Sequence, residues 1–146
     1  MKDYQGNYKE NNVILVIQEH NAVHDTTSAT SIAAVQASYL TRASAIIGLT
    51  TTGRTAHIAS KYRAQCPFLA ITRSAPAARS MQIFRGVVPL FYPEGRAEDW
   101  GQDVDDRIQF GVDFGKKNGF IKTGDTVICI TGWRKGAGSS NTVRIL

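Results

Sequence analysis

Hydroxyl groups, a glycine and an arginine gather where a short apolar segment of the chain ends. The apolar run AIIGL, residues 45–49, leads into a stretch where a helical pattern begins: Thr50, Thr51, Thr52, Gly53, Arg54 and Thr55. The free N–H groups and the dipole at a helix start, about half a positive charge, favour an anion. Threonine hydroxyls add donors, and the guanidinium fork suits phosphate. The stretch predicts a phosphate site, and the alternative is that Thr52 only caps the helix.

A second basic cluster follows a later apolar run, Thr126–Thr131. After Trp133 it continues as a glycine-rich segment that we take as a further part of the site: Arg134, Lys135, Gly136, Ala137 and Gly138. Glycines let a backbone approach a ligand closely. The Gly-Lys-Ser/Thr ending of a Walker A loop is missing, so the segment does not support binding of a nucleoside triphosphate. A generous hairpin loop is the alternative interpretation.

Trp100 and Arg107 form a third candidate, near the start of a long predicted helix. They are seven residues apart, which is about two helical turns, so both side chains can face the same way. The alternative for Trp100 is a partly buried surface aromatic. All three clusters follow or flank strand ends, and in open α/β sheets ligands collect beyond the carboxyl ends of the strands.

The free energies of binding favour a ligand with two anionic groups over a ligand with one. A hydrogen bond to a charged group contributes about 1.5–3 kcal/mol, whereas association costs about 4–15 kcal/mol. One phosphate held by a few such bonds would barely bind, and two phosphates held at separate clusters would bind well. We therefore expect a bisphosphate, or an anion-rich effector of similar length.

Other reactive residues do not form a catalytic set. His20 and His24 are four residues apart and lack a third metal ligand nearby, and His57 has no evident partner. Carboxylates near the start of the long helix suit the positive end of its dipole, which explains them without an active site: Asp103, Asp105 and Asp106. The sequence therefore predicts no catalytic residues and no metal site.

Helical and strand patterns alternate along the chain. Strands are predicted over 45–50, 67–71, 87–91, 126–131 and 143–146, and helices over 27–43, 54–63, 75–81 and 98–117. Thr27 or Ser28 is expected to cap the first of these helices, and Gly119 to end the last. Short apolar strands with helical spacers indicate a mostly parallel sheet covered on both faces. The final two strands are joined without a helix, so the last strand is expected to be antiparallel.

Length, charge and composition narrow the possible classes of protein. The chain has 146 residues, enough for one domain, and carries a net charge of +5. Its longest basic runs are pairs, which weakens a nucleic-acid interpretation, and no apolar run approaches the roughly 20 residues of a membrane span. Cys66 and Cys129 form no disulfide framework, so a reducing compartment and a cytoplasmic location are expected. Residues 1–24 are expected to be a divergent or disordered lead, and residues 25–146 the domain.

Two long stretches carry a family resemblance. The run LTTTGRTAHIASKYRAQCPFLAITRSAPAARSMQIFRGVVPLFY, residues 49–92, resembles the carboxyl-terminal domain of pyruvate kinase, and so does WGQDVDDRIQFGVDFGKKNGFIKTGDTVICITGWRKGAGSSNTVRIL, residues 100–146. The resemblance extends over residues 25–146 and is strongest to animal-type enzymes. It implies a three-layer α/β/α domain with a mixed five-stranded sheet whose last strand is antiparallel.

The resemblance also implies an allosteric site for fructose 1,6-bisphosphate. In the family one phosphate is held by the loop that matches Thr50–Thr55, and the other by residues that match Trp100 and Arg107. The segment matching Arg134–Gly138 closes over the sugar. This chain departs from the family pattern at Lys135, Ala137 and Ser139.

The function implied is that of a regulatory and assembly domain in a homotetrameric glycolytic kinase, which transfers phosphate from phosphoenolpyruvate to ADP. In the full-length family enzyme a separate barrel and lid perform catalysis with magnesium and potassium. Neither lies in these 146 residues, so no cofactor is expected in this domain and no activity from the chain alone. An excised domain, a truncated product and a divergent paralogue are all compatible with this pattern. The alternative function is an interaction module that associates with pyruvate kinase subunits without sensing the effector.

Overall fold

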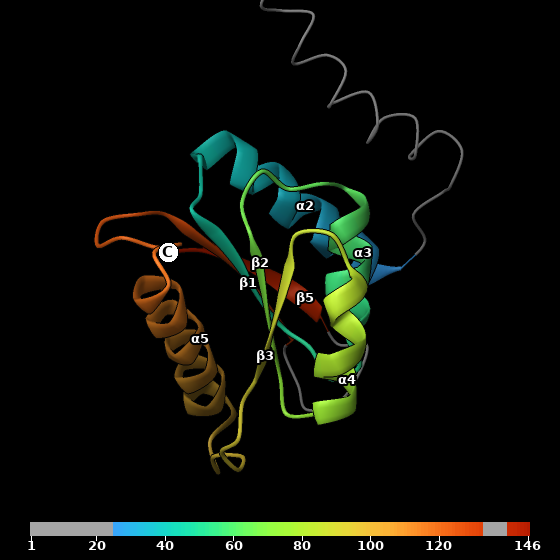
Figure 1. Ribbon diagram of the computed structural model, residues 1–146, viewed down its shortest axis with the longest axis vertical. Coiled ribbons are helices and arrows are strands. Elements are labelled where there is room, and N and C mark those ends of the chain that lie inside the picture. The colour runs from blue at the N-terminus through green and yellow to red at the C-terminus, as the bar shows by residue number, and fades with distance from the viewer. Residues whose placement is uncertain (1–24, 133–139) are drawn as a thin grey trace, which may run out of the picture.

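The computed structural model describes residues 25–132 and 140–146 as an α/β fold in three layers (Figure 1). A five-stranded sheet forms the middle layer, with the strand order β3-β2-β1-β4-β5. Figure 1 shows α5 on one side of the sheet, and α2, α3 and α4 on the other. The predicted lead, residues 1–24, and the predicted site residues Arg134–Gly138 lie outside the described residues.

The strands are short and mostly apolar, as predicted. Their bounds are Ala45–Leu49 for β1, Phe68–Thr72 for β2, Val87–Phe91 for β3, Val127–Gly132 for β4 and Ser140–Ile145 for β5. The first four strands run parallel, and β5 pairs antiparallel with β4. The prediction of a mixed sheet with an antiparallel last strand is confirmed. Strand β5 begins three residues earlier than predicted, because Ser140 already pairs with Gly132.

Helix α2 precedes the first strand, and α3, α4 and α5 connect the parallel strands. Their bounds are Thr26–Thr41 for α2, Arg54–Lys61 for α3, Ala75–Ser80 for α4 and Trp100–Lys117 for α5, with a short 3-10 turn over Met81–Ile83. The predicted cap of the first helix was wrong: Asp25 is the N-cap, and its carboxylate accepts a hydrogen bond from the N–H of Ser28. Gly119 follows α5 with φ +78, the left-handed conformation predicted for a helix end.

Two apolar layers hold the helices on the sheet, because successive side chains of a strand point to opposite faces. Ile46 and Ile128 pack in the layer that includes α2 and α3. Ile47 and Ile71 pack in the layer that includes α5. Gly111 sits in α5 against these last two residues, and a Cβ at Gly111 would lie 2.7 Å from Cδ1 of Ile71. The missing side chain lets α5 lie close to the sheet.

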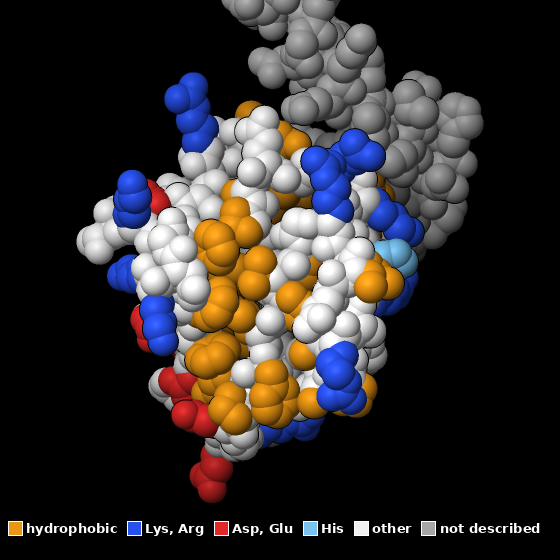
Figure 2. All heavy atoms as spheres, in the orientation of Figure 1, with side chains coloured by type: hydrophobic (Ala, Val, Ile, Leu, Met, Phe, Trp, Pro, Cys, Tyr) orange, Lys and Arg blue, Asp and Glu red, His pale blue; other side chains and the backbone are white. Residues whose placement is uncertain are grey.

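Strand β3 is the parallel edge of the sheet. Figure 2 shows apolar side chains gathered in a band over this strand, between α5 and α4. Val87, Val88 and Pro89 are half-buried, and Phe91 is exposed. Proline suits an edge strand because it has no N–H to donate to a further strand.

Candidate anion-binding site

The threonine loop, Thr50–Thr55, connects the end of β1 to the start of α3. Within it the N–H of Gly53 donates a hydrogen bond to Oγ1 of Thr50 at 2.9 Å. Gly53 is the N-cap of α3 with φ +87, and it offers no side-chain oxygen to the helix. Gly53 rather than Thr52 is therefore the N-cap, but the exposed Thr52 hydroxyl accepts a long hydrogen bond, 3.4 Å, from the N–H of Arg54. A glycine cap leaves the start of the helix open to an external acceptor.

Ser140, the first described residue after the glycine-rich segment, lies beside this loop. Oγ of Ser140 lies 3.0 Å from Oγ1 of Thr55, and both residues are buried. At the other end, Gly48 of β1 is level with Ile130 of β4, so β4 ends beside the start of the threonine loop. Residues 132 and 140, which flank the undescribed part of the segment, therefore both lie next to Thr50–Thr55.

Arg54 lies on the surface at the start of α3. Its Nη2 is 3.1 Å from Oδ2 of Asp25, and the two side chains are 54% and 40% exposed. A hydrogen bond from the Ser28 hydroxyl lowers the pKa of Asp25 most, and burial opposes it. The hydrogen bond from the Ser28 N–H and then the charge of Arg54 help to hold the pKa of Asp25 below its ordinary value. Arg54 is thus a solvated cation with a partner that water and ions can replace.

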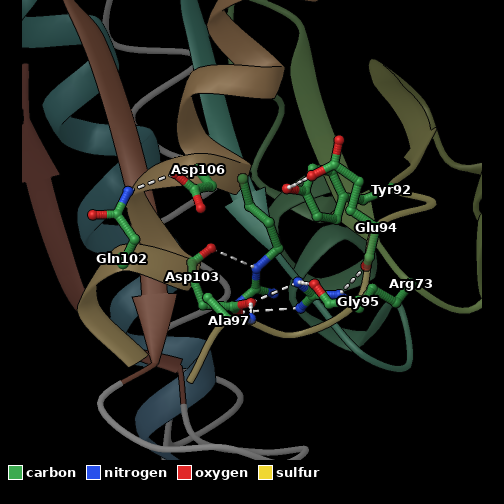
Figure 3. Close-up of polar contacts among 9 residues, drawn as sticks. Arg73, Tyr92, Glu94, Gly95, Ala97, Gln102, Asp103 and Asp106 are labelled. Atoms are coloured by element: carbon green, nitrogen blue, oxygen red, sulfur yellow. Dashed lines mark hydrogen bonds and ion pairs between the residues drawn. The ribbon is translucent and has the colours of Figure 1, made fainter. Parts of the chain in front are cut away.

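A second group of charges lies where the end of β2 meets α5, and we call it the arginine cluster. It consists of the half-buried Arg73 and the buried Asp103 and Arg107. The Asp103 side chain is only 2% exposed. Both of its oxygens accept hydrogen bonds from Arg73, at 2.6 Å for Oδ1 and 3.1 Å for Oδ2. Oδ1 also accepts from the N–H of Ala97 at 3.0 Å, and Nη2 of Arg107 is 2.9 Å from Oδ2. Figure 3 shows Arg73 and Ala97 converging on Asp103.

Each arginine of the cluster has further partners. Arg73 donates to the backbone carbonyls of Glu94 and Gly95 at 2.9 and 3.0 Å, and its guanidinium lies 5.0 Å from the centre of the Tyr92 ring. The Arg107 guanidinium lies 5.6 Å from the centre of the Trp100 ring, which confirms that these two side chains share a face of the helix. Cation–π contacts of this kind hold an arginine over an aromatic face.

Burial and charge act in opposite directions on the pKa values of the arginine cluster. Burial alone would raise the pKa of the Asp103 carboxyl, but the hydrogen bonds and positive charges of its partners outweigh burial and lower it. Burial lowers the pKa of Arg107, Asp103 raises it in part, and the charges of Arg73 and Arg96 lower it further. Since two arginines share one carboxylate, the cluster keeps a surplus of positive charge that an anion would neutralise.

The predicted site residues fall into two groups. The threonine loop lies at the start of α3, and Trp100 and Arg107 lie in the first half of α5. Both groups are at the carboxyl edge of the sheet: one follows β1 directly, and the other reaches Arg73, which follows β2. Helices α3 and α5 cover opposite faces, however, and in the part of the chain that the structure describes no hydrogen bond or ion pair joins Arg54 to Arg107.

Sequence reasoning missed Arg73, Asp25 and Ser140. Arg73 had a signal, because it follows an apolar strand at the edge where ligands collect. Asp103 had been noted as one of three acids at a helix start, and its spacing of four from Arg107 predicts an ion pair. Within residues 25–132 and 140–146, no group of three or more His, Cys, Asp or Glu side chains could hold a metal ion.

Burial also explains the two cysteines. Cys129 lies in the central strand β4, and burial raises the pKa of its thiol to about 11. Burial likewise raises the pKa of the half-buried Cys66 thiol. Neither thiol is suited to act as a nucleophile at neutral pH. None of the helices that the structure describes has the length and hydropathy of a transmembrane segment.

Comparison with known proteins identifies the fold. Residues 28–146 match the family model for the pyruvate kinase alpha/beta domain. The chain belongs to this family. It is 50% identical over 122 residues to pyruvate kinase PKLR from Homo sapiens and, likewise, from Rattus norvegicus. Against pyruvate kinase 2 from Saccharomyces cerevisiae it is 44% identical over 120 residues. The higher identity to the mammalian enzymes agrees with the animal-type resemblance of the sequence.

The matched region is a small part of each relative. It covers 84% of this chain and 21% of human pyruvate kinase PKLR, and 82% of this chain and 24% of the yeast enzyme. The chain therefore spans about a fifth to a quarter of the length of the curated relatives that it matches. The similarity concerns the alpha/beta domain of a pyruvate kinase.

Proposed function

We propose that this chain is the allosteric domain of a pyruvate kinase, a glycolytic enzyme, and that it binds fructose 1,6-bisphosphate. The observation that carries the proposal is the arginine cluster, in which two arginines share one buried carboxylate beside Trp100. A phosphate oxygen is a strong acceptor for a guanidinium, and the low-polarity surroundings strengthen such a bond. The threonine loop, with its open helix start and exposed Arg54, offers a second anion site at the same sheet edge.

The two sites differ in the face of the sheet that they adjoin, so a ligand must cross the strand ends to reach both. A sugar with phosphates at opposite ends is a suitable shape for that span. The segment Arg134–Gly138 lies between β4 and β5 in the sequence, and in this proposal it covers the sugar between the phosphates. In a full-length enzyme, binding here would alter the orientation of subunits and so couple to a distant active site.

Isothermal titration calorimetry with fructose 1,6-bisphosphate tests the proposal. We expect saturable heat and a rise in melting temperature, and a weaker response to fructose 6-phosphate, which occupies only one anion site. Arg107→Ala should weaken binding. An absence of both heat and thermal shift at millimolar ligand would count against effector binding.

A second candidate function rests on the other edge of the sheet. Strand β5 pairs with β4 on one side, and Ile145 and Leu146 next to its end are each 58% exposed. Exposed strand edges with apolar side chains favour pairing with another chain. The chain would then associate with pyruvate kinase subunits without sensing a metabolite. Mixing it with a complete pyruvate kinase and weighing the assembly, with and without fructose 1,6-bisphosphate, separates the two functions.

A further inference from the structure

The contacts of the Asp103 carboxylate are unequal. Arg73 contacts both of its oxygens and the N–H of Ala97 supplies a third bond, whereas Arg107 contacts it through Nη2 alone, at 2.9 Å. Arg73 is itself fixed by two backbone carbonyls and by the Tyr92 ring. Arg107 also donates from Nε to the Asp103 backbone carbonyl at 3.2 Å and lies over the Trp100 ring. Neither of these contacts involves the carboxylate, so Arg73 is the main partner of the Asp103 charge and Arg107 holds it by one contact.

This difference in contacts determines whether Asp103 keeps a partner when Arg107 moves away from it. A buried charge without a partner is strongly unfavourable. If Arg107 turns from Asp103 toward an anion, Asp103 keeps both bonds from Arg73 and the bond from Ala97. Its charge stays neutralised, so the release of Arg107 leaves no orphaned carboxylate.

Removal of Arg73 would have the opposite consequence. Asp103 is 2% exposed and would then depend on Arg107 for its only ion pair among the described residues. Arg107 would be held more firmly and would be less available to an external anion. The two arginines thus compete with each other for one carboxylate, and the outcome sets how freely Arg107 can bind a ligand.

We propose that Asp103 is an internal counter-ion that competes with the effector phosphate for Arg107, and that Arg73 is the positioning residue that makes the exchange possible. The inference rests on the proposed function, since it assumes that Arg107 binds a phosphate. It assigns opposite effects to two neighbouring residues of one ion-pair network: Asp103 weakens effector binding and Arg73 strengthens it. A merely structural role would give both residues the same sign, because losing either one would disorder the site.

Calorimetry with fructose 1,6-bisphosphate on four proteins tests the inference: wild type, Asp103→Asn, Arg73→Gln and the double variant. Asparagine keeps an acceptor for Ala97 and Arg73 but removes the charge. We expect Asp103→Asn to bind about 10-fold more tightly and Arg73→Gln about 10-fold more weakly. In the Asp103→Asn background, Arg73→Gln should change the affinity by less than about 3-fold, because there is no carboxylate left to hold Arg107.

Asp105→Asn is the matched control. Asp105 lies two residues away on the same helix, pairs with Arg144 at 3.2 Å and is 64% exposed. The Asp105→Asn variant loses the same charge from the same turn of α5, and its affinity for fructose 1,6-bisphosphate should stay within about 2-fold of wild type. A gain as large as that of Asp103→Asn would mean that net charge alone controls binding, and would overturn the inference.

A measurement on the wild type covers the case in which Asp103→Asn fails to fold. In nitrogen-15 NMR spectra, saturation with fructose 1,6-bisphosphate should shift the Nε–H resonance of Arg107 and leave that of Arg73 in place. Movement of both resonances, or of Arg73 alone, overturns the exchange. If the wild type shows no binding at all, the proposed function fails and this inference fails with it. If the wild type binds but both single variants weaken binding, only the inference fails.

Discussion

Arg54 and Arg107 occupy comparable places in two opposite layers. Each lies near the start of a helix at the carboxyl edge of the sheet, and each is paired with an aspartate. The Arg54 side chain is 54% exposed and that of Arg107 is 10% exposed. Water competes for every contact of Arg54, whereas the partners of Arg107 are dictated by the protein.

In the proposed function, this difference gives two kinds of anion site. Arg54 is solvated and paired with Asp25, and hydroxyls and the start of α3 lie beside it. Arg107 is held in place by Trp100 and Asp103, so a ligand there would exchange with an existing partner. We therefore expect weaker attraction at the first site and stronger, more selective binding at the second.

The largest expected effect comes from the buried carboxylate. Asp103→Ala leaves two arginines without a counter-ion, so the free energy of unfolding should fall by about 3–5 kcal/mol. Urea denaturation followed by tryptophan fluorescence measures it. Asp105→Ala, on the exposed side of the same helix, should cost less than about 1 kcal/mol. Equal losses for the two variants would show that burial does not separate these acids.

The next effect concerns the ligand. Arg107→Gln should weaken binding of fructose 1,6-bisphosphate by about 10- to 100-fold, the equivalent of one buried bond to a charged group. Arg54→Gln should weaken it by less than about 5-fold, because its contacts are screened by water. Calorimetry of both variants under one buffer gives the ratio. Equal losses of affinity would show that the surroundings of the two arginines do not differ in their effect on binding.

A smaller effect is expected at the exposed pair itself. Asp25 caps α2, so Asp25→Ala should lower the free energy of unfolding by about 1 kcal/mol. Arg54→Gln removes only the exposed partner of Asp25 and should change it by less than about 0.5 kcal/mol. Thermal unfolding of both variants distinguishes the cap from the ion pair. A larger loss for Arg54→Gln would show that the surface ion pair matters more than the cap.

The smallest effect is a difference in acid sensitivity. The pKa of Asp103 is held below the ordinary value of about 3.9. A carboxyl with a lowered pKa contributes stability that is present above its unfolded pKa and is lost as pH falls through its folded pKa. Urea midpoints from about pH 6 to about pH 2 should therefore fall less steeply in Asp103→Asn than in wild type. Asp105→Asn, which removes an exposed carboxyl, should follow the wild-type slope, and a flatter slope there would contradict the assignment.

Much of the fold was accessible from the sequence, for a physical reason. The inner strands β1, β2 and β4 are continuous apolar runs because both of their faces are covered, and runs such as PFLAI and TVICIT therefore predict buried strands. The helix cap was not accessible in the same way. Asp25, Thr27 and Ser28 are all good caps, and only the packing of α2 on the sheet decides which residue begins the helix.

The sequence predicted most of the cations of the candidate site, but it did not predict the side chains that pair with them. Trp100 and Arg107 share a helix, so their spacing alone predicts that they meet. Arg73 and Asp103 are thirty residues apart, and their bond depends on how β2 and α5 lie in space. The same holds for Thr55 and Ser140, which are separated by 85 positions. Long-range pairs of polar side chains leave no periodic signal in a single sequence.

Gly111 affects the geometry of the arginine cluster from a distance. This glycine is one turn beyond Arg107 and sets how closely α5 approaches Ile71 of β2, the strand that ends just before Arg73. An added methyl group would meet Cδ1 of Ile71 at 2.7 Å and Cγ2 of Ile47 at 3.2 Å, so these side chains or the helix would have to shift. A shift of the helix would change the 2.6 Å contact between Arg73 and Asp103. A substitution at Gly111 would thus change the arginine cluster, the anion site that we propose, from a position that contributes no side chain to it.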